Sequence, residues 1–211
     1  MGYSSDVAFS LAVKAAQTRK GSRRAYAQQE EAGAWETEIT DAVRGFIAAQ
    51  TSVFLATASV DGQPYMQHRG GPPGFLRVID NKTLGFVDFS GNRQYISTGN
   101  LAENPKAQLF LIDYAQRRRI KFWGTAQVIE GDADLVASLM PAGYKARPEQ
   151  VILFTVTAWD ANCPQHIPQR FDAVDVARIL ADRDAQVAAL EAEIADLRGH
   201  IAELPAQHPT P

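Results

Sequence analysis

The sequence predicts a mainly β protein, a small antiparallel barrel of six or seven strands with flanking helices and a C-terminal helix. Short runs of β-branched and apolar residues recur along the middle of the chain, separated by turn signals such as Asp61-Gly62 and Asp80-Asn81-Lys82. Segments on either side of these runs have the period of amphipathic helices. A chain of 211 residues, 45% of them apolar, has the length and the core material for one such domain with extensions.

The overall charge and the cysteine content exclude several classes of protein. The net charge of −3 gives no general attraction to nucleic acid or to anionic membranes. Cys163 is the single cysteine, which rules out an internal disulfide and a multi-cysteine zinc site. The sequence has no signal-peptide pattern at its start and no run of about 20 apolar residues. We therefore expect a soluble, cytoplasmic protein.

Residues 1–37 form a polar, alanine-rich arm with local positive charge, for example at Arg23-Arg24. We expect this arm to form short helices that pack on the barrel or on a partner subunit. The barrel domain is expected over residues 38–170 and begins with a helix over 38–50. Apolar residues lie on one face of this helix, namely Ile39, Val43, Phe46 and Ile47.

Runs of β-branched and apolar residues between turns predict the strands of the barrel. They are expected at residues 52–59, 64–69, 75–79, 84–89, 108–112, 120–129 and 151–158. Asp61-Gly62 predicts a tight hairpin in which both residues take positive φ. Short helices are expected over 96–103 and 133–140, and a loop over 159–170.

Residues 171–205 predict a helix with an apolar heptad in its second half, followed by a tail over 206–211. The heptad residues are Val187, Leu190, Ile194, Leu197, Ile201 and Leu204. Branched residues at one core position and leucines at the other favour a parallel two-stranded coiled coil between chains. In such a coil Glu193 and Arg198 can form an ion pair between the two helices. The alternative is an amphipathic helix that lies on its own barrel.

The order of strands and turns between Phe46 and Val128 has a counterpart in a known family. The matching features are Val53–Ala58, Asp61–Tyr65, the strand Leu84–Phe89, the turn Asn92-Arg93-Gln94, the helix end Leu101–Pro105 and the strands Ala107–Leu111 and Arg119–Gly124. This block resembles the pyridoxamine 5′-phosphate oxidase-like family of flavin-binding split barrels. The resemblance implies FMN as the cofactor and a homodimer with flavin at the subunit interface.

The turn Asn92-Arg93-Gln94 joins a strand to a helix start, where amide and guanidinium groups suit a phosphate. On an earlier strand, alternation sends Gln67 and Arg69 to one face and His68 to the other. The same alternation brings Arg117, Arg119 and Lys121 together on a later strand. With these positions the resemblance implies the following cofactor-binding candidates: Gln67, His68, Arg69, Gly70, Phe89, Ser90, Asn92, Arg93, Gln94, Arg119, Lys121, Trp159, Asn162 and Gln165.

Each of these positions also has a purely structural interpretation. The turn can be a solvated turn, His68 a buried structural histidine, Gly70-Gly71 a plain bend and the arginine cluster a charged hairpin. The chain also departs from the oxidase itself. Gln94 stands where the oxidase has a lysine, and Trp159 is not followed by its Arg-x-Leu signature. Oxidation of vitamin B6 is therefore not the expected reaction.

We expect an FMN-dependent oxidoreductase that acts on a small organic substrate. The sequence lacks a Gly-x-Gly-x-x-Gly motif, so any NAD(P)H would be a diffusing reductant. The candidates for a catalytic role are His68, Cys163 and His166, although flavin chemistry does not require a dedicated acid or base. The alternatives are a non-catalytic flavin-binding carrier, sensor or assembly protein, or a barrel that binds a deazaflavin or haem. Neither a metal site, nor nucleic acid, nor a membrane is expected.

Overall fold

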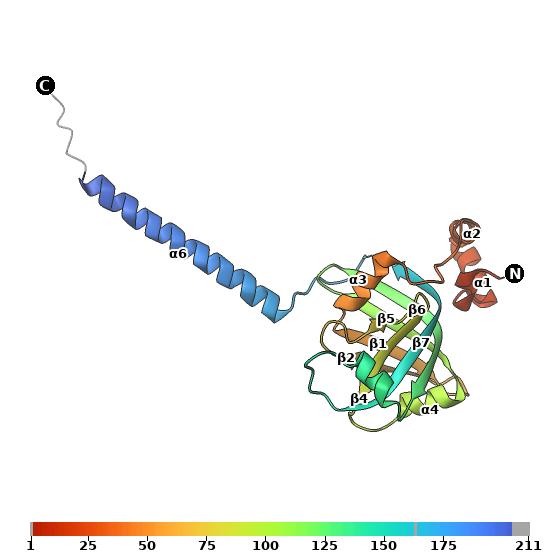
Figure 1. The fold of residues 1–211 in the computed structure, drawn as a ribbon. Coiled ribbons are helices and arrows are strands. Elements are labelled where there is room, and N and C mark those ends of the chain that lie inside the picture. The colour runs from red at the N-terminus through yellow and green to blue at the C-terminus, as the bar shows by residue number, and fades with distance from the viewer. Residues whose placement is uncertain (1, 163, 204–211) are drawn as a thin grey trace. The chain divides into compact units, whose positions relative to one another are not determined.

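The computed structural model describes residues 2–162 and 164–203. It divides into one unit that ends at Pro168 and a second that begins at Gln169 (Figure 1). The helices of the first unit are η1 (Ser4–Val7, a 3-10 helix), α1 (Leu11–Lys20), α2 (Arg23–Glu31), α3 (Asp41–Ala49), α4 (Ile96–Glu103) and α5 (Ala133–Leu139). Its strands are β1 (Ser52–Ala58), β2 (Pro64–Gly70), β3 (Arg77–Val78), β4 (Thr83–Phe89), β5 (Lys106–Asp113), β6 (Arg118–Ile129) and β7 (Pro148–Asn162).

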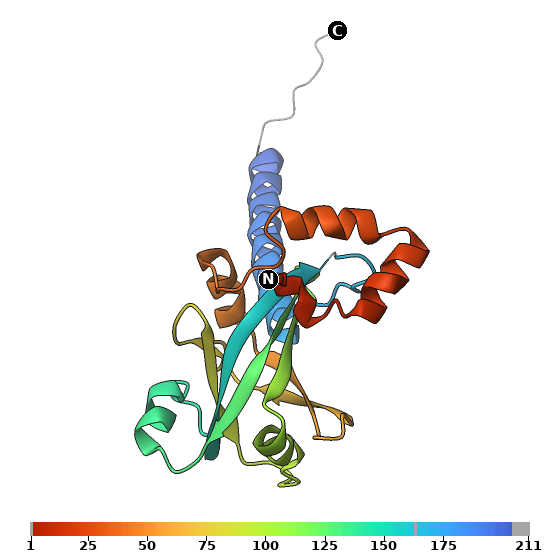
Figure 2. The ribbon, with the colours of Figure 1, turned by 90° about the vertical axis from the view of Figure 1, so that its right-hand side faces the viewer.

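The strands form a seven-stranded sheet in the order β2-β1-β5-β6-β7-β4-β3. Every pairing in this sheet is antiparallel. The two longest strands, β6 and β7, pair along most of their length and lie side by side in Figure 2 (green and cyan). The structure thus confirms the predicted antiparallel sheet with flanking helices.

Strands β2 and β4 lie toward opposite ends of the strand order but come together in space. Arg69 on β2 forms an ion pair with Asp88 on β4, with Nε 2.7 Å from Oδ1. No backbone pairing joins these two strands in the described part of the chain. The sheet therefore curls until its ends meet through side chains, which makes it a split barrel.

The barrel encloses one main apolar core. Along β1 the odd-numbered residues, for example Val53 and Leu55, are buried, while Ser52 and Phe54 point to the half-exposed outer face. Helix α3 adds Phe46 and Ile47 to the same core. Figure 1 shows α3 at one end of the barrel and α4 at the other. The outer face of the sheet is therefore not part of the core and stays half-exposed.

Three local expectations are corrected by the structure. Strand β7 continues through Asn162, because Trp159–Asn162 pair with β6, so the loop expected from residue 159 begins later. At the first hairpin Gly62 has a φ of +85° but Asp61 is not at positive φ, so the turn is not the predicted tight two-residue type. The strand expected over 75–79 is reduced to Arg77–Val78, since Phe75 turns into the core.

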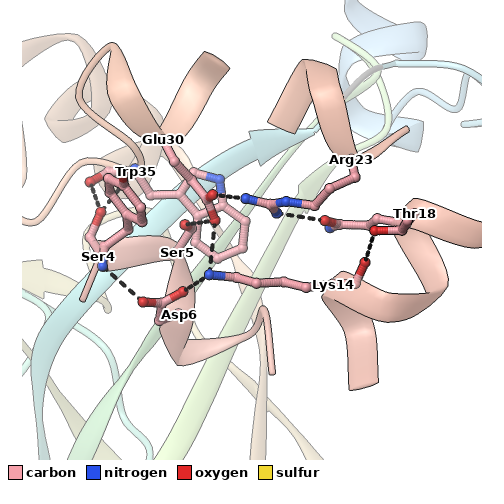
Figure 3. Close-up of polar contacts among 10 residues, drawn as sticks. Ser4, Ser5, Asp6, Lys14, Thr18, Arg23, Glu30 and Trp35 are labelled. Atoms are coloured by element: carbon pink, nitrogen blue, oxygen red, sulfur yellow. Dashed lines mark hydrogen bonds and ion pairs between the residues drawn. The ribbon is translucent and has the colours of Figure 1, made fainter. Parts of the chain in front are cut away.

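The arm before the barrel folds around a buried carboxylate, as Figure 3 shows. Glu30 is 3% exposed, and Arg23, Lys14 and the Ser5 hydroxyl surround its two oxygens. Burial alone would raise the pKa of Glu30, but the hydrogen bond and charge of Arg23, with Lys14 and Ser5, outweigh it and lower the pKa. Short polar helices are thus tied together by charge, since they bury little apolar surface.

The arm also contacts the barrel. The Trp35 ring stacks on Trp123 of β6, with centroids 4.6 Å apart and planes 20° apart. The Trp159 N–H donates to the Glu36 carbonyl at 2.8 Å, which extends the sheet by one bridge. One of the two expected positions of the arm, packing on the barrel, is therefore present in this chain.

The second unit contains helix α6 (Ala173–Glu203), which has 31 residues. Its described heptad residues Val187, Leu190, Ile194, Leu197 and Ile201 are all exposed, with Leu190 at 58%. Leu204 and the tail over 206–211 lie outside the described residues. Among the described helices none is both long and apolar enough to cross a membrane.

Candidate functional site

A strained turn connects β4 to α4. Phe89 ends the strand, and Gly91 to Tyr95 form the turn before the helix begins at Ile96. Arg93 and Tyr95 take φ values of 59° and 54°, in the left-handed region that residues with a side chain rarely adopt. Two such residues in one short turn point to a function, because left-handed backbone stores energy that the rest of the fold must offset.

A pocket lies beside this turn, at the split of the barrel. It is lined by β2 (Gln67, Arg69), by the end of β4 and the turn (Asp88, Phe89, Gly91, Asn92, Arg93, Tyr95), by the start of α4 (Ser97, Thr98) and by β7 (Glu149, Gln150). Gln67 and Arg69 face it together, as the alternation along β2 predicts. Chain segments separated by more than 80 positions thus meet at one pocket.

Arg69 does not enter this pocket as a free cation. Its Nε lies 2.7 Å from Asp88 Oδ1 and its Nη2 donates to Oδ2 at 3.4 Å. The Nε–H has no well-aligned acceptor among the described residues, so the close contact is an ion pair rather than a good hydrogen bond. Gln150 Nε2 also donates to Asp88 Oδ2, at 3.0 Å. Asp88 is therefore the centre of a polar cluster between β2, β4 and β7.

The carboxyl group of Asp88 has a raised pKa. Burial is the main cause, since the residue is 8% exposed, and nearby Glu149 adds to it, while the positive charge of Arg69 and the bond from Gln150 act against it. A raised pKa means that removal from water costs the carboxylate more than its partners return. Asp88 therefore protonates more readily than an exposed aspartate does.

Arg93 is also held by a carboxylate. Its Nε donates to the Tyr95 hydroxyl at 3.0 Å, and that hydroxyl donates to Glu149 Oε1 at 2.6 Å. Arg93 Nε itself lies 4.0 Å from the same oxygen. Both arginines of the pocket are therefore matched by an acidic residue, and these four groups sum to zero charge when all are ionised.

Neutral donors complete the pocket. Ser97 is 2% exposed, and its hydroxyl has no hydrogen-bond partner among the described residues. No side chain caps the start of α4, where Tyr95 is the N-cap residue. An orphaned hydroxyl beside an uncapped helix N-terminus suits an anion such as a phosphate. The residues present therefore fit the phosphate end of FMN.

A second hollow continues from the first along the split. It shares Gln67, Arg69, Asp88, Phe89 and Gly91 with the pocket and adds His68, Gly70, Phe75 and Val87. His68 projects mainly to the outer face, where its Nε2 lies 2.7 Å from the Ser52 hydroxyl and its ring contacts Phe54 edge-on. Of the two candidate catalytic residues that the structure describes, His68 and His166, His68 is therefore the one at the edge of this groove.

Other predicted site residues lie elsewhere on the molecule. Arg119 and Lys121 share the outer face of β6, whereas Arg117 lies in the turn before that strand. Strand β6 does not pair with β4, because β7 lies between them. Lys121 faces Asp160 across the ladder and offsets part of the burial that raises the pKa of Asp160. Neither basic residue lines the pocket within its own chain.

The remaining candidates follow the last strand or flank the turn. Trp159 packs against the core and donates from its ring nitrogen to the Glu38 carbonyl at 2.8 Å. Asn162 ends β7, and Gln165 and His166 are exposed in the turn that follows, with His166 at a φ of 62°. Cys163 lies outside the described residues. Ser90 and Gln94 belong to the turn but do not line the pocket.

Sequence reasoning missed seven of the twelve residues that line the pocket, namely Asp88, Gly91, Tyr95, Ser97, Thr98, Glu149 and Gln150. Asp88 is one position before Phe89, and a charged residue in an otherwise apolar strand was a usable signal. Ser97 and Thr98 follow the predicted phosphate turn on the predicted helix, so their hydroxyls also had a signal. Nothing in the sequence near Glu149 and Gln150 indicates that β7 brings them to this turn.

The family model for pyridoxamine 5′-phosphate oxidase matches residues 39–163, more than half of the chain. The chain therefore belongs to this family, which confirms the resemblance. No curated protein matches the chain.

The chain is similar to three solved structures of proteins that carry different names. HupZ of Group A Streptococcus has 21% identity and a TM-score of 0.49, over 63% of this chain and 99% of HupZ. An FMN-binding protein from Syntrophomonas wolfei has 12% identity and a TM-score of 0.45, over 69% of this chain and 97% of that protein. HutZ, a haem storage protein from Vibrio cholerae, has 13% identity and a TM-score of 0.40, over 57% and 91%. At such values these structures carry no argument about the ligand of this chain.

Proposed function

We propose that this protein is an FMN-dependent oxidoreductase of the cytoplasm that acts on a small organic substrate. The observation that carries the proposal is the pocket at the β4–α4 turn, where an orphaned Ser97 hydroxyl lies beside an uncapped helix N-terminus. Membership of a family that commonly binds flavin adds to it. The departures from the oxidase at Gln94 and after Trp159 direct the proposal away from vitamin B6.

The residues of the pocket divide into two groups by the part of FMN that they suit. Asn92, Arg93 and Ser97 would hold the phosphate, and Gln67, Arg69 and Phe89 would hold the part that extends along the split. When bound, FMN supplies the transfer of a hydride or an electron pair. The part of the chain is to orient the cofactor, to exclude water and to set the charge around it.

The proposal includes a homodimer with flavin at the subunit interface. Members of the family are typically dimeric, and the outer sheet face of this chain offers a suitable surface. Phe54, Phe110 and Lys121 lie in one row across β1, β5 and β6 on that face, half-buried by their neighbours. Contact of this face with a second copy would let Arg119 and Lys121 act on the flavin of the partner.

Helix α6 is proposed to pair with its copy as a parallel coiled coil. A helix gains most of its stability from packing an apolar face, and the heptad residues of α6 are exposed in the single chain. In the full chain, Leu190→Glu should reduce helix content by circular dichroism and weaken association by light scattering. Ala189→Glu, one position away and off the heptad core, is the matched control. Equal helicity and mass for both variants would rule out the coil.

The absorption spectrum of the purified protein tests the proposed cofactor. Bands at the flavin positions, and release of free FMN on denaturation, are expected. A Soret band, the spectrum of a deazaflavin or a colourless protein that does not take up added FMN would refute it. Reduction of the bound flavin by NAD(P)H or by candidate substrates, followed by reoxidation, then tests turnover.

A non-catalytic flavin carrier, sensor or assembly protein is the second candidate. It is favoured by the state of the acid–base groups at the pocket, because Asp88 and Glu149 are both engaged and His68 contacts Ser52 on the outer face. A yellow protein that no reductant or substrate reduces at a useful rate would support this second function over the first.

A further inference from the structure

A hollow lies between helix α3 and residues 74–78, at the end of the barrel where Figure 1 shows α3. We propose that this α3 hollow is a binding site for a small apolar carboxylate. Its volume of about 370 Å³ falls within the range of small-molecule sites, which begins at about 300 Å³. The proposed function makes no use of this hollow, so the inference adds a second ligand site to the barrel.

A backbone hydrogen bond joins the two walls of the α3 hollow. Ile47 and Ala48 belong to the wall that α3 forms, and Gly74, Leu76 and Val78 belong to the facing wall. The Gly74 N–H donates to the Ala48 carbonyl at 2.8 Å, and Gly74 has a φ of +82°, which glycine adopts readily. This bond fixes the walls against each other, so the site is formed before a ligand arrives.

The side chains that line the α3 hollow are apolar except for Arg44 and Arg77. Ile47 and Leu76 also belong to the main core of the barrel. Among the described residues of this lining there is no hydroxyl, amide or carboxylate side chain, whereas the pocket at the β4–α4 turn has all three. A phosphate suits a site with many donors of this kind. An apolar body with a single anionic group suits the α3 hollow better.

No acidic residue in the described part of the chain lines the hollow beside these two arginines. Arg77 Nη1 donates to the Ser138 carbonyl at 3.0 Å, which positions the guanidinium group without neutralising its charge. Arg44 Nε lies 3.4 Å from Asp41 Oδ1, but the Asp41 side chain is fully exposed, so water screens this pair. Asp80, which also interacts with Arg44, lies outside the lining. Because guanidinium groups pair well with carboxylates, the anionic end of the ligand is assigned to the arginines.

Neighbouring residues of one segment line the α3 hollow and the groove that continues from the pocket at the β4–α4 turn. Phe75 lines the groove, whereas Gly74 and Leu76 line the hollow. No residue is common to the lining of the hollow and that of the pocket or the groove. A carboxylate in the hollow therefore does not compete with FMN, and the inference does not depend on the proposed cofactor.

The test measures binding of octanoate to the full-length protein by isothermal titration calorimetry, with and without saturating FMN. Octanoate should bind more tightly than 1-octanol, which has the same chain length and no charge, and octylamine should bind least, because the arginines repel its charge. FMN should leave the affinity for octanoate unchanged. Loss of octanoate binding in the presence of FMN would place octanoate in the flavin pocket and overturn the inference.

Two substitutions test the assigned arginines. Arg44→Gln and Arg77→Gln should each weaken octanoate about tenfold, the effect of a hydrogen bond to a charged group, and should leave 1-octanol unchanged. Arg24→Gln is the matched control, because it makes the same change of charge at an exposed position in the arm. An affinity for octanoate that neither variant of the hollow alters would overturn the assignment.

A third substitution tests the hollow itself. Ala48→Leu places a larger side chain in the hollow and should abolish binding of both octanoate and 1-octanol. Ala49→Leu makes the same change at the next position, which is also exposed but outside the lining, and should bind both ligands as wild type does. Failure of octanoate to bind wild type, as expected if another protein chain covers the hollow, would overturn the inference, as would wild-type binding by Ala48→Leu.

Discussion

Replacement of Asp88 with asparagine should tighten the binding of FMN with little change in the stability of the ligand-free protein. Asp88 accepts from Arg69 and Gln150 at the split of the barrel. Asparagine keeps the shape and one acceptor but removes the negative charge. The four ionised groups of the pocket would then sum to +1 instead of zero, which favours a phosphate ligand.

The size of both effects can be derived from this geometry. A unit charge about 8 Å from another, at an effective dielectric constant of about 20, changes the interaction by about 2 kcal/mol. Affinity for FMN should therefore rise at least tenfold. The ligand-free protein loses the ion pair with Arg69, but it also loses the burial of a carboxylate whose pKa is raised. These two effects oppose each other, so a net change within about 1 kcal/mol is expected, well below the usual effect of breaking a buried pair.

The pH dependence of stability and of FMN binding tests the role of Asp88 in a second way. The pKa of Asp88 is higher in the folded protein than its unfolded value near 3.8. The contribution of Asp88 to stability is therefore fully present below pH 3.8, and it is lost as the pH rises through the pKa of the folded protein. By the same reasoning, binding of an anion beside Asp88 favours the protonated form. As the pH falls toward the pKa of Asp88, the affinity of wild type for FMN should therefore approach that of Asp88→Asn.

The assay is titration of apoprotein with FMN at several pH values, together with urea denaturation. The ionisation of the FMN phosphate affects wild type and variant alike, so the ratio of their dissociation constants isolates Asp88. Asp61→Asn makes the same change of charge in the exposed hairpin and should alter neither quantity. A weaker FMN complex in Asp88→Asn, or a ratio that is constant with pH, would refute the assignment of Asp88 to the phosphate pocket.

Three further predictions concern the turn, the sheet and the arm. Arg93→Ala should weaken FMN about tenfold by fluorescence titration, and an unchanged dissociation constant would contradict a role for this side chain. Gly124→Ala should destabilise the barrel by about 3 kcal/mol or more in urea, because its Cβ would lie 1.9 Å from the Thr155 carbonyl oxygen, whereas Gly45→Ala, in open space on α3, should be neutral or stabilising. Glu30→Gln should release the arm, at a cost of up to about 3 kcal/mol, as followed by tryptophan fluorescence of the Trp35–Trp123 stack. Because the pKa of Glu30 is lowered, wild type should lose this stability as the pH falls below about 4.5, and a variant with the wild-type acid transition would contradict the account.

Much of the barrel could be predicted because local pattern and tertiary environment agree there. The helix Ile96–Glu103 lies where the sequence places it, since Asn104-Pro105 ends it whatever packs around it. Strand β1 shows the alternation that one buried face imposes. Strand β7 was predicted too short because its last part, from Trp159, depends on pairing with β6, and no local pattern records that partner.

Only those parts of the site that belong to one local segment of the chain could be predicted from the sequence. The turn at Asn92-Arg93, its position before a helix and the facing of Gln67 with Arg69 follow from local chemistry and from alternation along a strand. The carboxylates that hold the two arginines were not foreseen. Asp88 was passed over inside an apolar strand, and Glu149 reaches the turn only because β7 pairs with β4.

The sequence by itself determined the elements of this protein, its apolar heptad and its family, because periodicity, turn chemistry and the order of motifs are properties of neighbouring residues. Only the tertiary structure decided the charge of the pocket and the state of its donors. The pairing of Arg69 with Asp88, the bridge from Arg93 through Tyr95 to Glu149 and the orphaned Ser97 hydroxyl arise when distant segments share a small volume from which water is excluded. In that volume, whether a polar group has a partner depends on distance in space rather than on position along the chain.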